Sequence, residues 1–404
     1  MRIKTSINYF SLVAFIFITT CISCTDKDSE KSTQKGFLSE SRLANEAGAL
    51  EVATSLDDTF KSLLKSTDCL QAYPDYFGGA TITDEGTLLI LVKGDTIKAK
   101  EDLISRAKSN NFTIKSCQYS LNELSKLKLG LADYFHQEQY RKELGWVAVG
   151  IRPSENKVFV RLKECSPQKI EEFKSKISDS DAIIFEFGEE VSSDSAPLPE
   201  GISVNRVSYN INPGSQFTVL DKSGSVGYRA RYAGYEGFVT AGHCIPKIAG
   251  IAYHSGNYAG DGKIYQLGPK VDAAFVQTKT TFSVTSNTQF GHYDLSSTII
   301  SLSFLDAAAV SMEGFKTAKA SHGVVEGVDV SVAMTQNMPY LGTKTYTVDY
   351  LMEASFSGQG GDSGGIVYGS VNKQIAGCYS GHSSTHRYFS YAGYINDLFK
   401  LTIY

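Results

Sequence analysis

The sequence predicts a mainly β protein in which antiparallel β-barrels follow an α+β domain. The composition favours strands, because the 404 residues include 23 tyrosines and 22 phenylalanines beside a single tryptophan. From residue 202 onward, short alternating strands follow one another at a spacing of about ten residues, with glycine at the turns. No amphipathic helix separates these strands before residues 395–401. Closed antiparallel barrels are therefore expected rather than βαβ units.

A change of composition divides the chain near residue 195. The part before residue 196 contains 25 Lys and Arg and 29 Asp and Glu, against 14 and 14 after it. The segment 192–199, rich in serine and proline, has the composition of a linker. We therefore expect an α+β domain at 51–195 and a barrel domain at 196–404. A net charge of −4 without a basic stripe argues against nucleic-acid partners.

The first residues have the pattern of an export signal. Two basic residues precede the apolar run 10–18, which is too short to span a bilayer, and small polar residues follow up to Cys24. This ending resembles the lipobox of bacterial lipoproteins, which implies a signal peptide at 1–23, lipidation of Cys24 and a polar tether at 24–50. Cys21 is a second candidate, and secretion without a lipid is the alternative. The acidic residues after Cys24 favour an outer-membrane or cell-surface location over a secreted or periplasmic one.

The α+β domain contains no catalytic constellation. Apolar residues at helical spacing predict helices near 56–64 and 121–131, and a further helix is expected at 167–177. A hairpin is predicted to turn at 84–86, and another strand to cover 157–162. Its cysteines, Cys69, Cys117 and Cys165, have no metal-ligand spacing, so buried thiols are the expectation.

The barrel domain is organised around the glycine-rich stretch 358–365, which contains Ser363. Glycine on both sides lets the backbone adopt unusual dihedral angles, so that the N–H groups of Gly361 and Ser363 are able to converge on an anion. These are the requirements of an acyl-transfer site, and we predict that Ser363 is a nucleophile.

Two further residues fit the chemistry that such a serine requires. His243 comes directly after a predicted strand, and Asp272 stands at the head of another, beside an apolar run. A serine hydroxyl needs an imidazole to accept its proton, and the imidazole needs a buried carboxylate to orient it. An unpaired buried carboxylate is costly, so His243 is the predicted partner of Asp272.

Together, the motifs around His243, Asp272 and Ser363 resemble, in that order, the signatures of chymotrypsin-like serine proteases. The short interval from His243 to Asp272 and the preceding α+β domain are most similar to the bacterial branch of α-lytic protease and the streptogrisins. The resemblance implies a chymotrypsin-like double antiparallel β-barrel preceded by a pro domain. It implies His243 as general base, Asp272 as its orienting acid, Ser363 as nucleophile, and Gly361 with Ser363 as oxyanion donors.

The same resemblance assigns supporting roles. Ser380 matches a serine whose strand pairs with the substrate backbone and whose hydroxyl supports the aspartate. Asp362 matches a buried carboxylate that shapes the oxyanion turn, with Lys316 in the place of its cation. The cysteine that usually pairs with Cys244 is missing, since Ser225 stands near its position. A Cys244–Cys378 bridge and two buried thiols both remain open.

Substrate selection is the other departure from the family. Ser357 falls at the base of the specificity pocket, and no carboxylate is present there to select Arg or Lys. His382 replaces a glycine, and His386 and Arg387 follow closely. These residues either narrow the pocket or favour an acidic residue before the scissile bond, so an apolar and an acidic specificity stay open.

The sequence therefore predicts a secreted or surface-anchored serine endopeptidase without a cofactor or metal. Its partners are expected to be protein or peptide substrates, its own pro region as an intramolecular inhibitor and folding aid, and a membrane through the lipid anchor only. Cleavage of the pro region is expected near 190–205. The alternative is a catalytically silent protease fold used for binding or adhesion. An α/β-hydrolase is excluded, because no acidic residue lies between Ser363 and the histidines that follow it.

Overall fold

The computed structural model describes residues 38–63, 73–193, 196–197, 209–220, 222–245, 250–338 and 342–404. The predicted signal peptide and Cys24 lie outside these residues, as do Cys69 and residues 194, 195, 198 and 199 of the predicted linker. Within the described ranges, no helix combines the length and the apolar character needed to cross a membrane.

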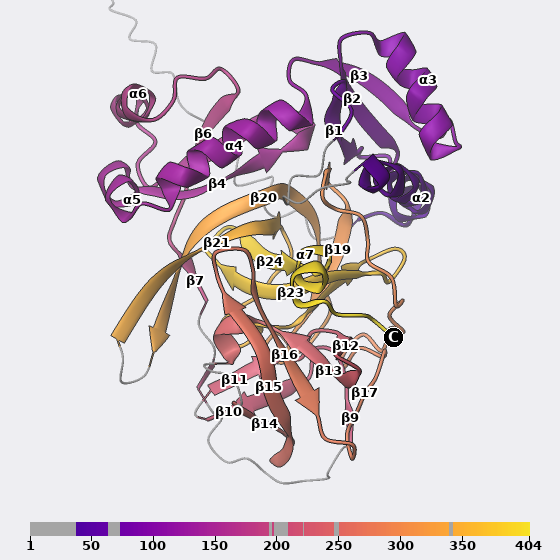
Figure 1. The fold of residues 1–404 in the computed structure, drawn as a ribbon, viewed down its shortest axis with the longest axis vertical. Coiled ribbons are helices and arrows are strands. Elements are labelled where there is room, and N and C mark those ends of the chain that lie inside the picture. The colour runs from indigo at the N-terminus through magenta and orange to yellow at the C-terminus, as the bar shows by residue number, and fades with distance from the viewer. Residues whose placement is uncertain are drawn as a thin grey trace, which may run out of the picture. The chain divides into compact units, whose positions relative to one another are not determined.

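The α+β part of the chain before residue 196 is called the pro half below. Its first part is a small α/β layer (Figure 1). It contains α2 (Glu40–Leu63), β1 (Phe77–Ile82), β2 (Leu88–Lys93), α3 (Thr96–Ala107) and β3 (Thr113–Cys117). Strands β1 and β2 form the predicted hairpin, and β3 runs parallel to β2. Helix α3 begins at Asp95, whose side chain accepts hydrogen bonds from the backbone of Ile97 and Lys98.

Helix α2 corrects the expected start of the folded pro half. A tether was expected up to residue 50, but the helix begins at Glu40. The reason is the helical spacing of buried side chains on one face of α2. These are Ala49, Leu50, Ala53, Leu56 and Phe60.

The second part of the pro half packs helices on a three-stranded sheet. Its elements are α4 (Leu121–Phe135), α5 (Glu138–Leu144), β4 (Trp146–Arg152), β5 (Lys157–Leu162), α6 (Pro167–Lys176) and β6 (Ile183–Phe187). Helix α4 begins with a capping box, in which the Ser120 hydroxyl accepts from the Glu123 backbone and the Glu123 carboxylate accepts from the Ser120 backbone. All three helices expected from the sequence are present.

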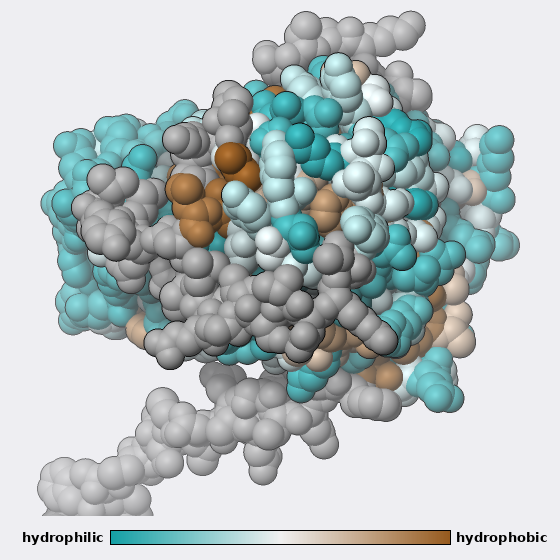
Figure 2. All heavy atoms as spheres, turned by 90° about the horizontal axis from the view of Figure 1, so that it is seen from below, coloured by the Kyte–Doolittle hydropathy of each residue, from teal (hydrophilic) through white to brown (hydrophobic). Residues whose placement is uncertain are grey.

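The first barrel contains seven strands of one antiparallel sheet. They are β10 (Gln216–Val219), β11 (Lys222–Ser225), β12 (Arg229–Tyr232), β13 (Tyr235–Thr240), β14 (Ile251–His254), β15 (Asn257–Leu267) and β16 (Asp272–Thr278). They pair in the order β12-β13-β16-β15-β14-β10-β11, and the short strand β8 (Ala196–Pro197) pairs with the outer edge of β11. Phe217, Phe238 and Val276 lie in its core. Seen from below, the molecule presents a mostly hydrophilic surface with small apolar groups (Figure 2).

The second barrel closes through an extra strand pairing. Its strands are β19 (Ala309–Glu313), β20 (Ser321–Met338), β21 (Gly342–Ala354), β22 (Ile366–Gly369), β23 (Ile375–His382) and β24 (Arg387–Tyr391), followed by helix α7 (Ala392–Phe399). They pair in the order β19-β22-β23-β24-β21-β20, and β20 also pairs with β19. The predicted double antiparallel β-barrel preceded by an α+β domain is confirmed.

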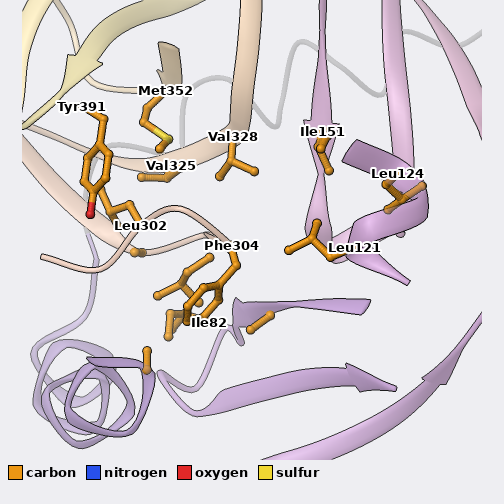
Figure 3. Packing of buried hydrophobic residues seen from close by; sticks show 14 of the residues in the cluster. Ile82, Leu121, Leu124, Ile151, Leu302, Phe304, Val325, Val328, Met352 and Tyr391 are labelled. Atoms are coloured by element: carbon orange, nitrogen blue, oxygen red, sulfur yellow. The ribbon is translucent and has the colours of Figure 1, made fainter. Parts of the chain in front are cut away.

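The pro half and the second barrel share sheets and a core. Strand β20 pairs antiparallel with β4, and the short strand β18 (Leu305–Asp306) pairs parallel with β1. Figure 3 shows side chains of this shared core, in which Ile82, Leu121 and Ile151 of the pro half belong to the same buried cluster as Phe304 and Val328. Burial of this apolar surface stabilises the precursor as one compact unit.

Candidate active site

His243 and Asp272 are held together at two points. Strand β13 ends just before His243, and Asp272 begins the neighbouring strand β16, so the sheet brings them side by side. The His243 Nδ1 atom lies 2.7 Å from Asp272 Oδ2, and the His243 backbone N–H donates to Oδ1 at 3.0 Å. Both side chains are fully buried. The carboxylate thus fixes the orientation of the imidazole and leaves Nε2 for a second partner.

The electrostatics of this pair favour a charged imidazole. Burial by itself would lower the pKa of His243, but the Asp272 carboxylate outweighs it and raises this pKa above its ordinary value. A histidine that accepts a proton from a serine becomes a cation, and the same carboxylate stabilises that cation.

Ser363 lies beside this pair, on a loop of the second barrel that is fastened to the first barrel. The Ser225 backbone N–H donates to the Ser363 carbonyl at 2.8 Å, and the Cys244 thiol lies 3.6 Å from that carbonyl. Ser363 is buried, and so is the His243 Nε2 atom, which has no hydrogen-bond partner in the part of the chain described here. The structure brings the three predicted residues to one place without a serine–histidine hydrogen bond.

The loop around Ser363 offers two unoccupied amide donors. Gly361 has a φ of 102° and Gly364 a φ of 85°, in the left-handed region that favours glycine. A Cβ at Gly364 would collide with the Thr240 side chain. The N–H groups of Gly361 and Ser363 donate to no acceptor among the described residues. Both amides are available for an anion, as the oxyanion prediction requires.

Ser225 is a positioning residue that the sequence reasoning missed. Its hydroxyl donates to the Gly361 carbonyl at 3.0 Å and accepts from the Phe315 backbone N–H at 3.0 Å. The sequence indicated Ser225 only as the place of a missing cysteine. In the structure, its side chain and backbone both hold the loop that carries Ser363.

The predicted ion pair between Asp362 and Lys316 is wrong, because the backbone of Lys316 and not its side chain contacts the carboxylate. Asp362 is fully buried, and its Oδ1 atom accepts from the backbone N–H groups of Lys316 and Thr317 at 2.9 and 2.8 Å. Its Oδ2 atom accepts from the Thr317 hydroxyl and from the Gln359 backbone. Several neutral donors therefore stabilise this carboxylate, and the Lys316 ammonium forms no ion pair with it.

The expected contact of Ser380 with the aspartate is indirect. Ser380 is buried, and its hydroxyl lies 3.0 Å from the hydroxyl of Ser390 on β24. Ser390 accepts from the Asp272 backbone N–H at 3.1 Å and donates to the Asp272 carbonyl at 3.0 Å. Ser390 is thus a second residue that sequence reasoning missed, and it anchors the backbone of the acid.

The residues expected to select substrates lie on three neighbouring segments. Ser357 is exposed, and its backbone N–H donates to the Ser321 hydroxyl. His382 ends β23 opposite Arg387 of β24. The Arg387 Nε atom donates to the carbonyl of Gly358 at 3.0 Å, next to Ser357.

His386 belongs to a different environment. One ligand atom of His386 lies within 4.8 Å of the carboxylates of Glu326 and Glu353, and Glu353 forms an ion pair with Arg161 of the pro half. Burial lowers the pKa of His386. This histidine therefore faces the contact with the pro half.

The end of the pro half crosses the strand that carries Ser380. Strand β7 (Val191–Ser192) pairs antiparallel with β23, with Ser192 opposite His382, and parallel with β20. A Cβ at Gly381 would lie 2.5 Å from the Ser192 carbonyl, so the two backbones are in close approach. This is the pairing that the family resemblance assigns to a substrate.

Cysteine pairing is settled for the described residues. Cys117, Cys165, Cys244 and Cys378 are free thiols, so the Cys244–Cys378 bridge does not form. Burial raises the pKa of the Cys378 thiol well above its ordinary value.

Comparison with protein-family models gives two matches in the N-terminal half. Residues 35–117 match the Pro-like N-terminal domain, and residues 122–188 match the Pro-like C-terminal domain. No match was found among curated proteins. Among solved structures, the chain is similar to the protease NAPase of Nocardiopsis, to a chymotrypsin of Cellulomonas bogoriensis and to protease A of Thermobifida fusca.

The three structural similarities have the same coverage. Sequence identities are 25%, 22% and 20%, and TM-scores are 0.40, 0.39 and 0.39, in the order named. Each comparison covers 48% of this chain and 98% of the other.

The two antiparallel barrels and the matched Pro-like domains define a chymotrypsin-like protease fold that carries a pro region. The predicted resemblance to the branch of α-lytic protease and the streptogrisins is confirmed, since residues 35–188 contain both parts of a pro region of that type.

Proposed function

We propose that this chain is the precursor of an exported serine endopeptidase. The observation that carries the proposal is the buried, two-point contact of His243 with Asp272 beside the Ser363 loop. In the reaction, His243 Nε2 takes the proton of the Ser363 hydroxyl, whose oxygen attacks the peptide carbonyl. The amides of Gly361 and Ser363 hold the oxyanion, and His243 then returns the proton to the leaving amine.

We also propose that the pro region keeps the precursor inactive. Support comes from β7, whose backbone occupies the edge of β23 next to Ser380. A substrate needs the same edge, because peptide recognition by strand pairing uses the backbone hydrogen bonds of a free strand. Cleavage between the pro half and the barrels releases this edge. A role of the pro region as a folding aid fits the long-range β topology, which folds slowly.

Covalent labelling tests the catalytic part of the proposal. Processed wild-type protein is expected to react with a fluorophosphonate probe at Ser363, and the Ser363→Ala protein is expected to remain unlabelled. Peptide mapping of the labelled protein identifies the modified residue. A processed, folded wild-type protein that takes up no label would favour the catalytically silent binding or adhesion protein instead.

The location of the enzyme is a separate proposal. We propose a lipoprotein of the outer membrane or cell surface, anchored through Cys24, on the strength of the sequence motif at the N-terminus. Metabolic labelling with a radioactive fatty acid is expected to mark the wild-type protein and to spare the Cys24→Ala variant. Labelling of both would contradict the anchor at Cys24.

A further inference from the structure

The guanidinium of Arg387 is fixed beside the segment that precedes the nucleophile. Arg387 starts β24 and lies opposite His382 of β23 on one side and Ala354 of β21 on the other. Its Nε atom donates to the Gly358 carbonyl at 3.0 Å, and Nη1 donates to the carbonyls of Ser383 and His386 at 3.0 and 3.2 Å. Backbone acceptors from two segments thus hold the cation in one position.

This cation has no acidic partner. Within the described residues, Arg387 forms no ion pair, and its Nη2 atom makes no hydrogen bond. Arg152 and Arg161 of the pro half, by contrast, each contact a carboxylate. Only neutral carbonyls accept hydrogen bonds from this half-buried guanidinium. It is therefore able to donate to an incoming carboxylate, through one or two hydrogen bonds.

A second donor packs against Gly358. Tyr379 of β23 is buried, and its hydroxyl has no hydrogen-bond partner in the part of the chain that is described. A Cβ on Gly358 would lie 2.9 Å from the Tyr379 Cζ atom, so the ring packs directly against this glycine. Burial and the charge of Asp362 raise the pKa of Tyr379, against the charge of Arg387, so the hydroxyl stays protonated and is able to donate. A buried hydroxyl without a partner requires an explanation.

We infer that Arg387, assisted by the Tyr379 hydroxyl, selects an acidic side chain immediately before the scissile bond. This inference rests on the proposed protease function, and it decides between the two specificities that the sequence left open. Ser357 and Gly358 precede the nucleophile, and β23 and β24 follow it, so the cation stands among the segments that the family resemblance assigns to substrate selection. His386, which the sequence also suggested, faces Glu353 and Arg161 instead.

An apolar specificity does not fit these groups as well. Burying an apolar side chain against an unpaired guanidinium and an unpaired hydroxyl would remove water from both without supplying a new partner. A carboxylate supplies acceptors for both donors. Sites that hydrogen-bond a polar substrate group discriminate strongly against analogues that lack it.

Peptide p-nitroanilides that differ only in the residue before the scissile bond test the inference. Processed wild-type enzyme is expected to hydrolyse the Asp or Glu peptide with a kcat/KM about 100-fold above that of the Phe peptide, the scale of a charge-assisted contact. Arg387→Gln is expected to abolish most of this ratio, and Arg387→Lys to restore part of it. Tyr379→Phe, which removes only the hydroxyl, is expected to reduce the ratio several-fold.

Two controls keep the result interpretable. Arg231→Gln removes an exposed arginine of the first barrel and is expected to leave the ratio unchanged. Fluorophosphonate labelling of Ser363 reports on the catalytic machinery without a side chain in the specificity pocket. Labelled enzyme that prefers the Phe peptide, or that keeps its acidic preference in Arg387→Gln, overturns the inference. Absence of labelling in the wild type contradicts the proposed function itself.

Discussion

Arg161 of the pro half and Glu353 of the second barrel form a buried, bidentate ion pair. The Arg161 Nη2 atom lies 2.7 Å from Glu353 Oε1, and Nη1 contacts Oε2. The exposed fractions of the two side chains are only 2% and 0%. Burial by itself would raise the pKa of Glu353, but the Arg161 guanidinium outweighs it and lowers this pKa to about 2. The pair therefore joins the pro half to the second barrel through two buried, opposite charges.

Replacing Glu353 with glutamine tests the strength of this contact. In the inactive Ser363→Ala precursor, Glu353→Gln is expected to lower the free energy of unfolding by about 3–5 kcal/mol, because Arg161 stays buried and keeps only one contact with a carboxylate, that of its Nε atom with Glu186. Urea unfolding measures this change. Lys163→Gln is the matched control, since Lys163 and Glu190 form a pair in which both side chains are at least half exposed, worth under about 1 kcal/mol. Equal effects of the two substitutions would contradict the assigned burial.

Acid is expected to weaken the precursor through His386. Burial lowers the pKa of His386, the nearby Arg161 guanidinium acts in the same direction, and the carboxylates of Glu353, Glu326 and Glu186 oppose them. In the unfolded chain this pKa is about 6.5. Below pH about 6.5, the unfolded state therefore binds a proton at His386 before the folded state does. The free energy of unfolding is full above that pH, and this contribution is lost as the pH drops to and through the lowered pKa of the folded state. The urea midpoint of the Ser363→Ala precursor between pH 8 and 5 measures this loss.

The variant His386→Gln isolates this contribution. Other buried acids near the pro half, such as Asp329, have raised pKa values and titrate with the opposite sign. The difference between the two pH profiles removes their effect. A profile of His386→Gln as steep as that of the parent protein would assign the acid sensitivity to another group.

The buried thiols are expected to resist alkylation. Cys244 and Cys378 are free and almost completely buried. Burial raises the pKa of Cys378, and thiolates rather than thiols are the reactive species. Iodoacetamide is therefore expected to modify Cys244 and Cys378 only after the protein is unfolded. Peptide mapping before and after unfolding measures this, and a disulfide-linked peptide containing both would contradict the structure.

The sequence motifs predicted residues that the structure places near one another. His243, Asp272 and Ser363 were predicted because acyl transfer needs an imidazole, a carboxylate and a hydroxyl, and the fold brings these three residues together. Ser225 and Ser390 were missed, because serine is common and nothing in the local sequence marks a hydroxyl that acts across two strands. The supposed Lys316 cation was wrong, because the backbone amides that hold Asp362 do not depend on residue type.

Ser225 is expected to affect catalysis without contacting the substrate. Ser225→Ala removes the hydrogen bond to the Gly361 carbonyl and the acceptor for the Phe315 amide. The oxyanion amides are then less well oriented, and we expect kcat to fall about tenfold with little change in KM. Steady-state kinetics on one peptide measures both constants. Ser223→Ala, two residues earlier on β11 and equally buried, is the control, and a similar loss there would indicate a general effect on the strand.

The processing site follows from the register of β7 and the charge of Arg387. Ser192 lies opposite His382 in an antiparallel pair. In such a pair, the residue two positions further along one strand lies opposite the residue two positions earlier on the other strand. A peptide that keeps this register presents its second residue after Ser192 to Ser380, the residue of β23 that reaches Asp272 through Ser390. In the sequence that residue is Asp194, which lies outside the described residues.

We therefore expect self-cleavage after Asp194, so that the mature protein begins at Ser195. N-terminal sequencing of the processed protein measures the site, and Asp194→Ala is expected to slow processing at least about tenfold, as a carboxylate-selective pocket requires. Arg387→Gln is expected to slow it in the same way, whereas Glu200→Ala, which removes another acid of the linker, is expected to leave it unchanged. Processing of the Ser363→Ala protein would assign the cleavage to another protease. A mature N-terminus that follows an apolar residue and depends on Ser363 would contradict both the register and the acidic specificity.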